Sequence, residues 1–528
     1  MRKFILLGLF VTLIMSCNSV KKYNQQISAL HPVEALQNDV DKLYKQLQKH
    51  HPKLYQYTSK SDLDFKFDSL KKSINQPLTS PEFYKKVAPV VTNVRQGHVA
   101  VGYTVIKFTK KERKTLKKKK LEFYDLDFEY LESKLWVKDN FGKDSALVGA
   151  EVVSIADEPI SKLIEIYKTR FASDGYNKTL HDRFVSKGFS VFYTRDKGFL
   201  DSLKVTFRNK DSLFIKTFRR LLKEEIKNDS LILNEEKIIP EKLSKEEKKT
   251  NRISRRKKKK DDIKYGLIKK NVYARNFDFI GKDSTVACMK IRTFTNGNYK
   301  KFYQESFTKL DSANTKHLII DLRDNGGGRI AEIDKFYSYL TKDDYQFITD
   351  SEVNSRIPFL KSFMSNTSPN SLKVVAGILS PIMIIHNLFK IRKKEGKLYY
   401  RFNKNTKMKT PNPLNFKGDI YVLINGNSFS ASSLISTHLK ANKRAVFVGE
   451  ETGGAYNGTV AGIYKVYQLP VSKLVVRMGL MQIEAPQKQF PDGFGIKPDI
   501  EMLPTVKDRR KNIDTELEWV LNDIYKSE

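Results

Sequence analysis

The stretch IYVLINGNSFSASSLISTHLKANKRAVFVGEETGG, residues 420–454, decides the fold. Apolar runs over 420–424 and 445–448 predict two buried strands, and the residues between them have helical spacing. Ser430 stands at the turn from strand to helix, where the free N–H groups of the helix start favour negative charge on a hydroxyl oxygen. An ordinary N-cap serine would occupy the same place. The local sequence therefore leaves both catalysis and capping open.

A second motif, HLIIDLRDNGGG at 317–328, is an apolar strand that ends on three consecutive glycines. Glycines permit positive φ and leave their N–H groups uncovered, so such a loop can direct amides at a developing oxyanion. The loop lacks the GK[ST] ending of a phosphate loop and does not match GxGxxG, which argues against a nucleotide site. Further apolar runs, such as 286–291, alternate with helical spacing and predict an α/β core over 263–528.

Two regions of different character precede that core. Residues 32–105 are predicted to be helical, because Val40, Leu43, Tyr44 and Leu47 fall on one helix face. The next region, 106–221, alternates instead between apolar and polar residues, which predicts a small β domain.

The β domain and the segment after it carry weaker signals. Residues 147–163, LVGAEVVSIADEPISKL, resemble the strand, turn and helix start of a PDZ-like module. Residues 222–262 are dominated by Lys, Glu and Arg, so they are predicted to form a basic charged linker or a long exposed helix.

The N-terminus has the layout of an export signal over 1–16. Arg2 and Lys3 precede an apolar run from Phe4 to Met15, which is too short to span a bilayer. The end of this run resembles a bacterial lipobox. That resemblance implies cleavage before Cys17, lipidation of this cysteine, a tether over 17–31 and anchoring in the cell envelope, at the periplasmic face or the outer membrane.

No segment after the N-terminal run is expected to cross a membrane. No other segment has eighteen consecutive apolar residues, and the most apolar internal stretch, 374–389, is interrupted by Pro381, His386 and Asn387.

Composition bounds the remaining possibilities. The 528 residues are 40% hydrophobic, enough for a substantial core. With Cys17 lipidated, Cys288 is the remaining cysteine and no intramolecular disulfide can form. The net charge of +36 raises the question of nucleic acid, but basic runs such as 255–260 lack zinc-ligand spacing and interleaved aromatics. We expect solvated loops, or contact with anionic headgroups or polysaccharide, rather than nucleic-acid binding.

Taken together, the motifs resemble a known enzyme family. DLRDNGGG, SFSASSLIS, VGEETGG and GFGIKPDIEM occur in the order typical of peptidase family S41, which includes the C-terminal processing peptidases and the tricorn core. The resemblance implies a ClpP/crotonase-like α/β peptidase core. It also implies a serine-type endopeptidase or carboxyl-terminal processing peptidase that acts on peptides or proteins through an acyl-enzyme, without a cofactor.

The same resemblance assigns the nucleophile and the oxyanion hole. The first serine of the SAS triplet maps to Ser430, with three nearby serines as outside possibilities. The oxyanion hole maps to the amide of Ala431 and to that of Gly326 or Gly327. The three alternative serines are Ser428, Ser432 and Ser433.

The base is assigned by a departure from the family pattern. The processing-peptidase branch uses a lysine at the place occupied here by Ala455, so a Ser/Lys dyad would need Lys465 to reach the site. The tricorn and retinoid-binding-protein branch carries a GH motif, which matches Gly97 and His98. Histidine has an unperturbed pKa near 6.5, so kcat/KM should rise through an apparent pKa within about one unit of that value.

A carboxylate is expected to orient His98. Asp492, just before GFGIKPD, matches the acidic position of many such sequences, with Asp324 and Glu450 as competitors. The other histidines show no HExxH spacing, so no metal site is predicted.

Two non-enzymatic alternatives stay open. Because the histidine branch includes retinoid carriers, the chain could be a non-catalytic lipoprotein that binds hydrophobic ligands or peptides on the same fold. It could also be a scaffold that captures peptide C-termini through the PDZ-like module.

Overall fold

The computed structural model describes residues 19–142, 145–223, 244–281, 283–402 and 404–527. The predicted signal peptide and Cys17 lie outside these residues.

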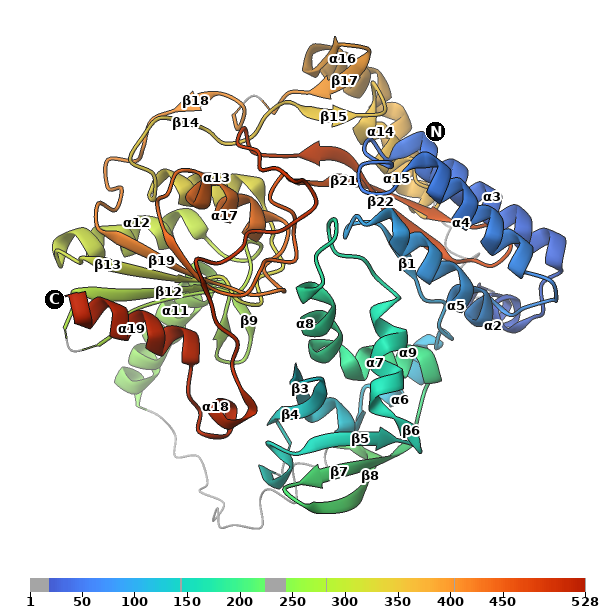
Figure 1. Ribbon diagram of the computed structural model, residues 1–528, viewed down its shortest axis with the longest axis horizontal. Helices are drawn as coiled ribbons and strands as arrows, with labels where there is room; N and C mark the ends of the chain where they lie inside the picture. The colour runs from blue at the N-terminus through green and yellow to red at the C-terminus, as the bar shows by residue number, and fades with distance from the viewer. Residues whose placement is uncertain (1–18, 143–144, 224–243, 282, 403, 528) are drawn as a thin grey trace.

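A six-stranded sheet forms the centre of the molecule (Figure 1). Of its five strand pairings, the first is antiparallel and the other four are parallel. This arrangement confirms the predicted α/β pattern. In spatial order the strands are β11 (Arg275–Phe279), β12 (Val286–Ile291), β13 (His317–Asp321), β19 (Asp419–Ile424), β20 (Val446–Gly449) and β23 (Ile500–Glu501).

Helices cover both faces of this sheet. On one face lie α12 (Tyr299–Ser312), α13 (Ile330–Ser338) and α17 (Ala431–Ala441), and on the other lies α19 (Thr515–Ser527). Strand residues alternate between the two layers: Ile320 packs toward the first face and Ile319 toward α19.

Helices also form the N-terminal region, as predicted. Val40, Leu43 and Leu47 are buried on one face, and Tyr44 stacks on Phe67 with ring centroids 4.2 Å apart. The helices are α2 (Ser19–Ser28), α3 (Val33–His50), α4 (Lys60–Ser73) and α5 (Ser80–Val91).

A β hairpin ties this helical region to the C-terminal half. β21 (Thr459–Gln468) and β22 (Val475–Ile483) leave the core, and β22 pairs with β1 (Ala100–Gly102). Leu474 and Val476 of the hairpin share a hydrophobic core with the N-terminal helices. The segment predicted as one core over 263–528 therefore also completes the N-terminal region.

The third region contains a sheet with its own helices and core. The PDZ resemblance of this region stays a prediction. Its longer strands are β3 (Leu126–Leu131), β4 (Lys134–Asn140), β5 (Glu151–Ile155), β7 (Ser202–Asn209) and β8 (Ser212–Leu222), with β2 (Lys119–Leu121) at one edge and β6 (Glu158–Pro159) beside β5; the helices are α6 (Lys110–Leu116), α7 (Ile160–Lys168), α8 (Thr179–Lys187) and α9 (Phe189–Lys197).

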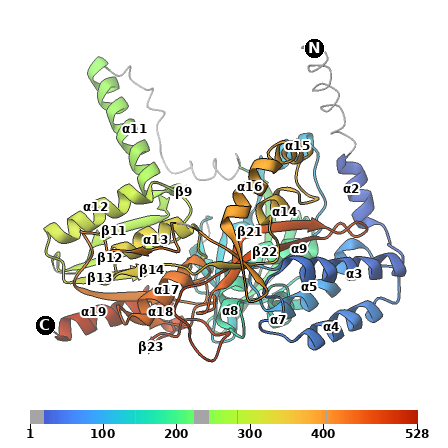
Figure 2. The same ribbon diagram turned by 90° about the horizontal axis from the view of Figure 1, so that it is seen from above.

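Most of the described part of the basic segment is a long exposed helix, α11 (Lys245–Tyr265). A long exposed helix was one of the two forms predicted for this segment. Ser244 caps α11, and Glu247 completes a capping box. The helix projects from the body of the molecule (Figure 2).

An insertion rises from the C-terminal half between β15 (Ser351–Val353) and β17 (Lys397–Tyr400). It contains α14 (Pro358–Phe363), α15 (Asn370–Ile378), α16 (Ser380–Lys390) and β16 (Ile391–Lys394). Residues 370–390 have a mean hydropathy of 1.7 and are 11% buried, so by length and composition they could cross a membrane. The expectation that nothing beyond the N-terminal run crosses a membrane stays a prediction, although Pro381, His386 and Asn387 do not make this segment polar on average.

Short elements complete the chain: β9 (Leu267–Lys269), β10 (Val272–Tyr273), β14 (Tyr345–Gln346), β18 (Met408–Lys409) and α18 (Val506–Arg510).

Candidate active site

Ser430 occupies the N-cap position of α17 but does not cap the helix. Its side chain accepts no hydrogen bond from the helix start. Its backbone has a positive φ of 58° with ψ −117°, a conformation that residues other than glycine rarely adopt. The Oγ atom instead lies 3.0 Å from Nε2 of His98. The capping interpretation, which the sequence left open, is therefore excluded by geometry.

His98 reaches Ser430 because its loop is fixed from two sides. The strand β1 begins two residues later and pairs Ala100 with Arg477 of β22. On the other side, the Gly97 amide donates to Oδ1 of Asp174 at 2.8 Å. A Cβ at position 97 would lie 2.5 Å from the tip of the Phe429 ring and 3.2 Å from the Ala172 carbonyl oxygen, so any larger residue would require both groups to shift. The GH motif thus has a steric reason in this fold.

The second ring nitrogen of His98 faces a tyrosine. Tyr464 of β21 places its hydroxyl 3.3 Å from Nδ1. The Arg477 guanidinium lies over the Tyr464 ring, 4.6 Å from the ring centroid. The group that orients the imidazole is therefore a phenol rather than a carboxylate.

Asp492 does not contact His98, contrary to the expectation. Its Oδ2 accepts from Gln56 Nε2 at 2.9 Å, and its Oδ1 accepts from Asn457 Nδ2 at 3.0 Å and from the Gly493 amide at 2.6 Å. The carboxylate organises the loop before β23 and links it to the N-terminal region.

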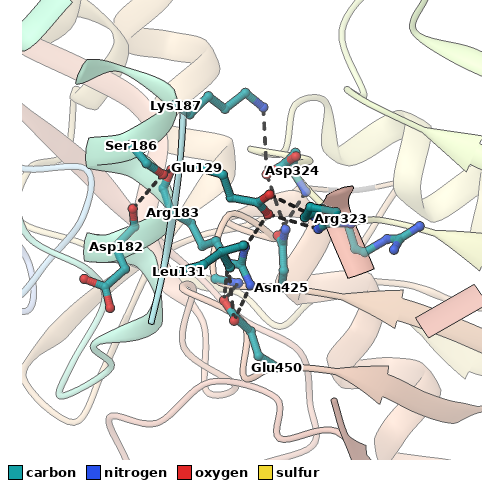
Figure 3. Close-up of polar contacts among 12 residues, drawn as sticks. Glu129, Leu131, Asp182, Arg183, Ser186, Lys187, Arg323, Asp324, Asn425 and Glu450 are labelled. Atoms are coloured by element: carbon teal, nitrogen blue, oxygen red, sulfur yellow. Dashed lines mark hydrogen bonds and ion pairs between the residues drawn. The ribbon is translucent and has the colours of Figure 1, made fainter. Parts of the chain in front are cut away.

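The two competing carboxylates belong to another cluster, shown in Figure 3. Glu450 accepts a bidentate pair from Arg183 and a bond from the Gly426 amide. Asp324 accepts from Asn427 Nδ2 at 2.8 Å. Arg183 also bonds Glu129, so this cluster joins the β domain to the core. Neither carboxylate is bonded to His98.

Burial sets the protonation of His98. The ring is 9% exposed, and desolvation, helped by the positive charge of Arg477, lowers the pKa of His98 to about 4. The expected value near 6.5 was too high, because the sequence does not reveal the burial or the absence of a carboxylate partner. At neutral pH the ring is uncharged and can accept a proton.

Asp174 is a further ionisable group that the sequence did not reveal. It is fully buried, and burial raises the pKa of its carboxyl to about 7, against the opposing effect of the Gly97 amide. Its Oδ2 has no hydrogen-bond partner of good geometry in the described structure, although Thr459 and the Ala455 amide favour its charged form. The surrounding sequence, FASDGYN, carries no motif, so only the tertiary structure places this residue at the site.

A cavity of about 500 Å³ opens beside Ser430. Its wall is mainly apolar, and Ser430, Ala431 and Asp174 border it. The larger apolar side chains that line it are Ile330, Phe402, Leu434 and Ile483.

The glycine loop contacts the nucleophile closely. A Cβ at Gly327 would lie 2.8 Å from the Ala431 nitrogen and 2.9 Å from the Ser430 Cβ. The Gly327 amide donates to Asn325 Oδ1 at 2.9 Å, and Gly326 does not line the cavity. Gly328 does line it. Within the described residues the Ala431 amide donates no hydrogen bond, so it is available to an oxyanion.

The alternative serines have other partners or positions. Ser428 Oγ donates to the Leu322 carbonyl, and Ser433 Oγ donates to the Ser428 carbonyl. The Ser432 hydroxyl is buried without a partner in the described structure. None of the three is bonded to His98.

The alternative lysine also lies elsewhere. Lys465 Nζ donates to the Lys361 carbonyl at 3.4 Å, and alternation along β21 puts it on the face opposite Tyr464. Ala455 lines the cavity but brings no amine. Among the described residues, no group of three or more His, Cys, Asp or Glu side chains could hold a metal ion.

Known proteins resemble this chain in its fold and in part of its sequence. The family model "Peptidase family S41" matches residues 285–502. Mature CPAF superposes with a TM-score of 0.59 at 14% identity, over 92% of this chain and 96% of its own. CPAF complexed with lactacystin gives 0.59 at 15%, over 92% and 97%. The photosystem II D1 C-terminal processing protease gives only 0.41 at 13%, over 89% and 93%.

The likeness to CPAF shows the fold alone, because identities of 14% and 15% are too low to carry function. By sequence alone, no curated protein matches the chain significantly. The family match covers both β12 to β20 and the hairpin β21–β22, which together hold Ser430 and Tyr464. Over residues 285–502 the chain is therefore similar to peptidase family S41.

Proposed function

We propose that the protein is a serine-type peptidase that hydrolyses peptide bonds through an acyl-enzyme, with Ser430 as nucleophile and His98 as general base. The observation that carries the proposal is the 3.0 Å approach of Ser430 Oγ to Nε2 of a buried, neutral His98. The serine has no capping role that would otherwise explain it.

The proposed reaction follows from these positions. Ser430 Oγ attacks the peptide carbonyl and passes its proton to His98 Nε2, while the Ala431 N–H donates to the oxyanion. Collapse of this intermediate transfers the proton from Nε2 to the leaving amine and leaves an ester on Ser430. Water then attacks the ester, again with His98 as base, and releases the carboxylic acid.

Tyr464 takes the role that a carboxylate has in other triads. When Nε2 accepts from Ser430, Nδ1 carries hydrogen and donates to the Tyr464 oxygen. A phenol can also donate to Nδ1, which would leave hydrogen on Nε2 and disable the base. Tyr464 therefore favours the productive tautomer less strongly than a carboxylate would.

The cavity suggests which peptides are cleaved. Its apolar lining beside Ser430 favours a large apolar side chain next to the scissile bond. The same cavity would receive this side chain whether the enzyme cleaves internally or near the carboxyl terminus. A library of peptides that vary only in the residue next to the scissile bond therefore measures the preference directly.

A fluorophosphonate probe tests the proposal, since it phosphonylates only an activated serine. We expect labelling of Ser430, identified by peptide mass spectrometry, and loss of labelling in Ser430→Ala. Ser433→Ala, which removes another hydroxyl at the cavity wall, is the matched control and should still be labelled. An unlabelled, folded wild-type protein would refute the peptidase proposal.

One observation favours a second function, a carrier of apolar ligands or peptides. The cavity is largely apolar, and the base lacks a carboxylate partner. A carrier would leave the probe unreacted and would bind a fluorescent apolar ligand equally well with or without the Ser430 hydroxyl.

We also propose that the protein is lipid-anchored in the cell envelope through Cys17, on the basis of the lipobox-like sequence at the end of the apolar run. Mass spectrometry of the native N-terminus should find an acylated cysteine, and Cys17→Ser should release the protein from the membrane fraction. An unmodified peptide that starts downstream of Cys17 would contradict this.

A further inference from the structure

The helix pair α15–α16 presents an apolar surface with little protein to cover it. Ile378 is 72% exposed, Ile382 66% and Phe389 83%. Ala376 and Asn387 are the buried residues of the pair, so only a narrow strip packs against the body. An exposed apolar surface of this extent on a folded protein marks a contact site.

The charge around the pair indicates what it contacts. No acidic residue occurs between Val353 and Lys394. Basic residues flank the apolar surface on both sides: Arg356, Lys361, Lys373, Lys390, Arg392, Lys393 and Lys394. Apolar side chains bordered by lysine and arginine suit the boundary between acyl chains and anionic headgroups. The same charges would repel a second copy of this surface.

Two other elements lie on the same side of the molecule (Figure 2). The first is α11, whose central residues 248–260 are exposed and contain basic but no acidic side chains. The second is α2, the first helix that the structure describes. A flat anionic surface on this side would therefore meet basic charge beyond the apolar pair, at roughly 1 kcal/mol for each lysine or arginine close to it.

Both ends of the helix pair are joined to the same protein body, which favours a pair that lies along a surface and does not cross a bilayer. The α14 end is hydrogen-bonded to β21, through Ser362 Oγ to the Tyr464 carbonyl at 2.6 Å. The other end continues into β16, which pairs with β17 of the same body. Because both ends return to one side, and Leu379 interrupts the helix before Pro381, a span is excluded by connectivity.

We propose that α15–α16 is a membrane-contact element whose apolar residues insert into the interfacial region of an anionic lipid bilayer, with the flanking basic residues on the headgroups. This contact is additional to any lipid on Cys17 and is independent of peptidase activity. It places the insertion, and through it β21, at the lipid surface.

Site-specific fluorescence on the full chain tests the proposal. Both native cysteines are first removed with Cys17→Ser and Cys288→Ala. In this background Phe389→Cys carries an environment-sensitive label. The matched control is Phe65→Cys, which is 72% exposed and belongs to α4, a helix on the opposite side of the molecule in Figure 2. We expect vesicles of phosphatidylglycerol and phosphatidylcholine to raise the emission at position 389 several-fold, with quenching by brominated lipid, and to leave position 65 unchanged.

Three further measurements can overturn the proposal. Adding Ile378→Ser, Ile382→Ser and Ile385→Ser should lower the emission response at position 389 at least ~5-fold, while labelling of Ser430 by the fluorophosphonate stays normal. Vesicles of phosphatidylcholine alone, without the anionic lipid, should give a weaker response at position 389. No response at position 389, or equal responses at 389 and 65, refutes membrane contact. A lipid-independent response that rises with protein concentration, with a doubled mass in sedimentation, assigns the surface to a second copy instead.

Discussion

The core helix α17 is more buried than the helix pair α15–α16, although its composition is less apolar. The sequence of α17, ASSLISTHLKA, is rich in hydroxyls, yet nine successive residues from Ala431 to Leu439 are buried. The sequence of α16, SPIMIIHNLFK, is more apolar, yet Asn387 is its one buried residue within the described structure. Hydropathy therefore does not decide which of two helices lies inside.

Tertiary position explains the inversion. In α17 most of the buried polar side chains have partners, Ser432 being the exception: Ser436 Oγ donates to the Ser432 carbonyl at 2.9 Å, Thr437 to the Tyr456 carbonyl at 2.9 Å, and His438 Nε2 lies 2.7 Å from the Phe347 carbonyl. A buried hydroxyl with a partner costs little. The buried helix α17 begins directly after Ser430, whereas α15–α16 leaves its apolar side chains exposed.

The largest expected effect lies at the start of α17. Ser430→Ala should lower peptide hydrolysis by ~10⁵-fold or more, because the covalent route is lost. The melting temperature should hardly change, since the side chain makes no capping bond. Activity against a peptide library and thermal unfolding measure the two quantities. Surviving activity together with a lower melting temperature would make Ser430 a structural residue.

Matched truncations compare the two helices directly. Ile435→Ala removes a fully buried side chain of α17 and should lower the free energy of unfolding by about 2 to 5 kcal/mol. Ile382→Ala removes an exposed side chain of α16 and should change it by about 0.5 kcal/mol or less in the absence of lipid. Urea titration measures both. Equal losses would show that α16 is packed in solution.

The buried base and an exposed histidine of α16 form the next pair. His98→Ala should cost ~10²-fold or more in kcat/KM, whereas His386→Ala should cost nothing. Because burial lowers the pKa of His98 to about 4, the base is protonated only below that pH, so the acid limb of kcat/KM should lie near 4 and not near 6.5.

The charge of Arg477 provides a second readout of that pKa. Arg477→Gln removes a nearby cation, so the imidazolium becomes easier to form and the acid limb should move to higher pH. Burial is the larger cause, so the limb should stay below 6.5. An acid limb that does not move would exclude His98 as the titrating group.

The smallest effect is expected at the tyrosine. Tyr464→Phe removes the hydrogen-bond partner of Nδ1, and a net contribution of about 0.5 to 1.5 kcal/mol corresponds to roughly a 2- to 10-fold lower kcat/KM. Single-turnover acylation measures it, with the melting temperature as control. A much larger loss would mean that the phenol does more than orient the ring.

The sequence predicted the features that depend on residues close together in the chain. The strands of the sheet were predicted from short apolar runs, whereas the pairing of Ser430 with His98 was predicted from the resemblance of the SAS and GH motifs to the family. The position of Asp492 failed because a carboxylate that follows a motif can bond any of several neighbours, here Gln56 and Asn457. Tyr464 sits in an ordinary alternating strand and gave no signal.

Exposure was the other limit of the sequence. The segment 374–389 reads as apolar whether it packs inside or lies outside, because periodicity does not say what a helix faces. The Gly327 amide likewise seemed free in the motif, but the Asn325 side chain two residues earlier takes it.

The hairpin β21–β22 also determines when the enzyme can first act. It spans residues 459–483, near the end of the chain, yet it holds β1 and so the loop that carries His98. A growing chain makes His98 early, Ser430 late and this hairpin later still. Until the hairpin is synthesised and paired, the histidine has no fixed position, and an unfinished polypeptide cannot cleave itself or its neighbours. The order of the segments therefore predicts that the proposed peptidase cannot act before this hairpin has been synthesised and paired.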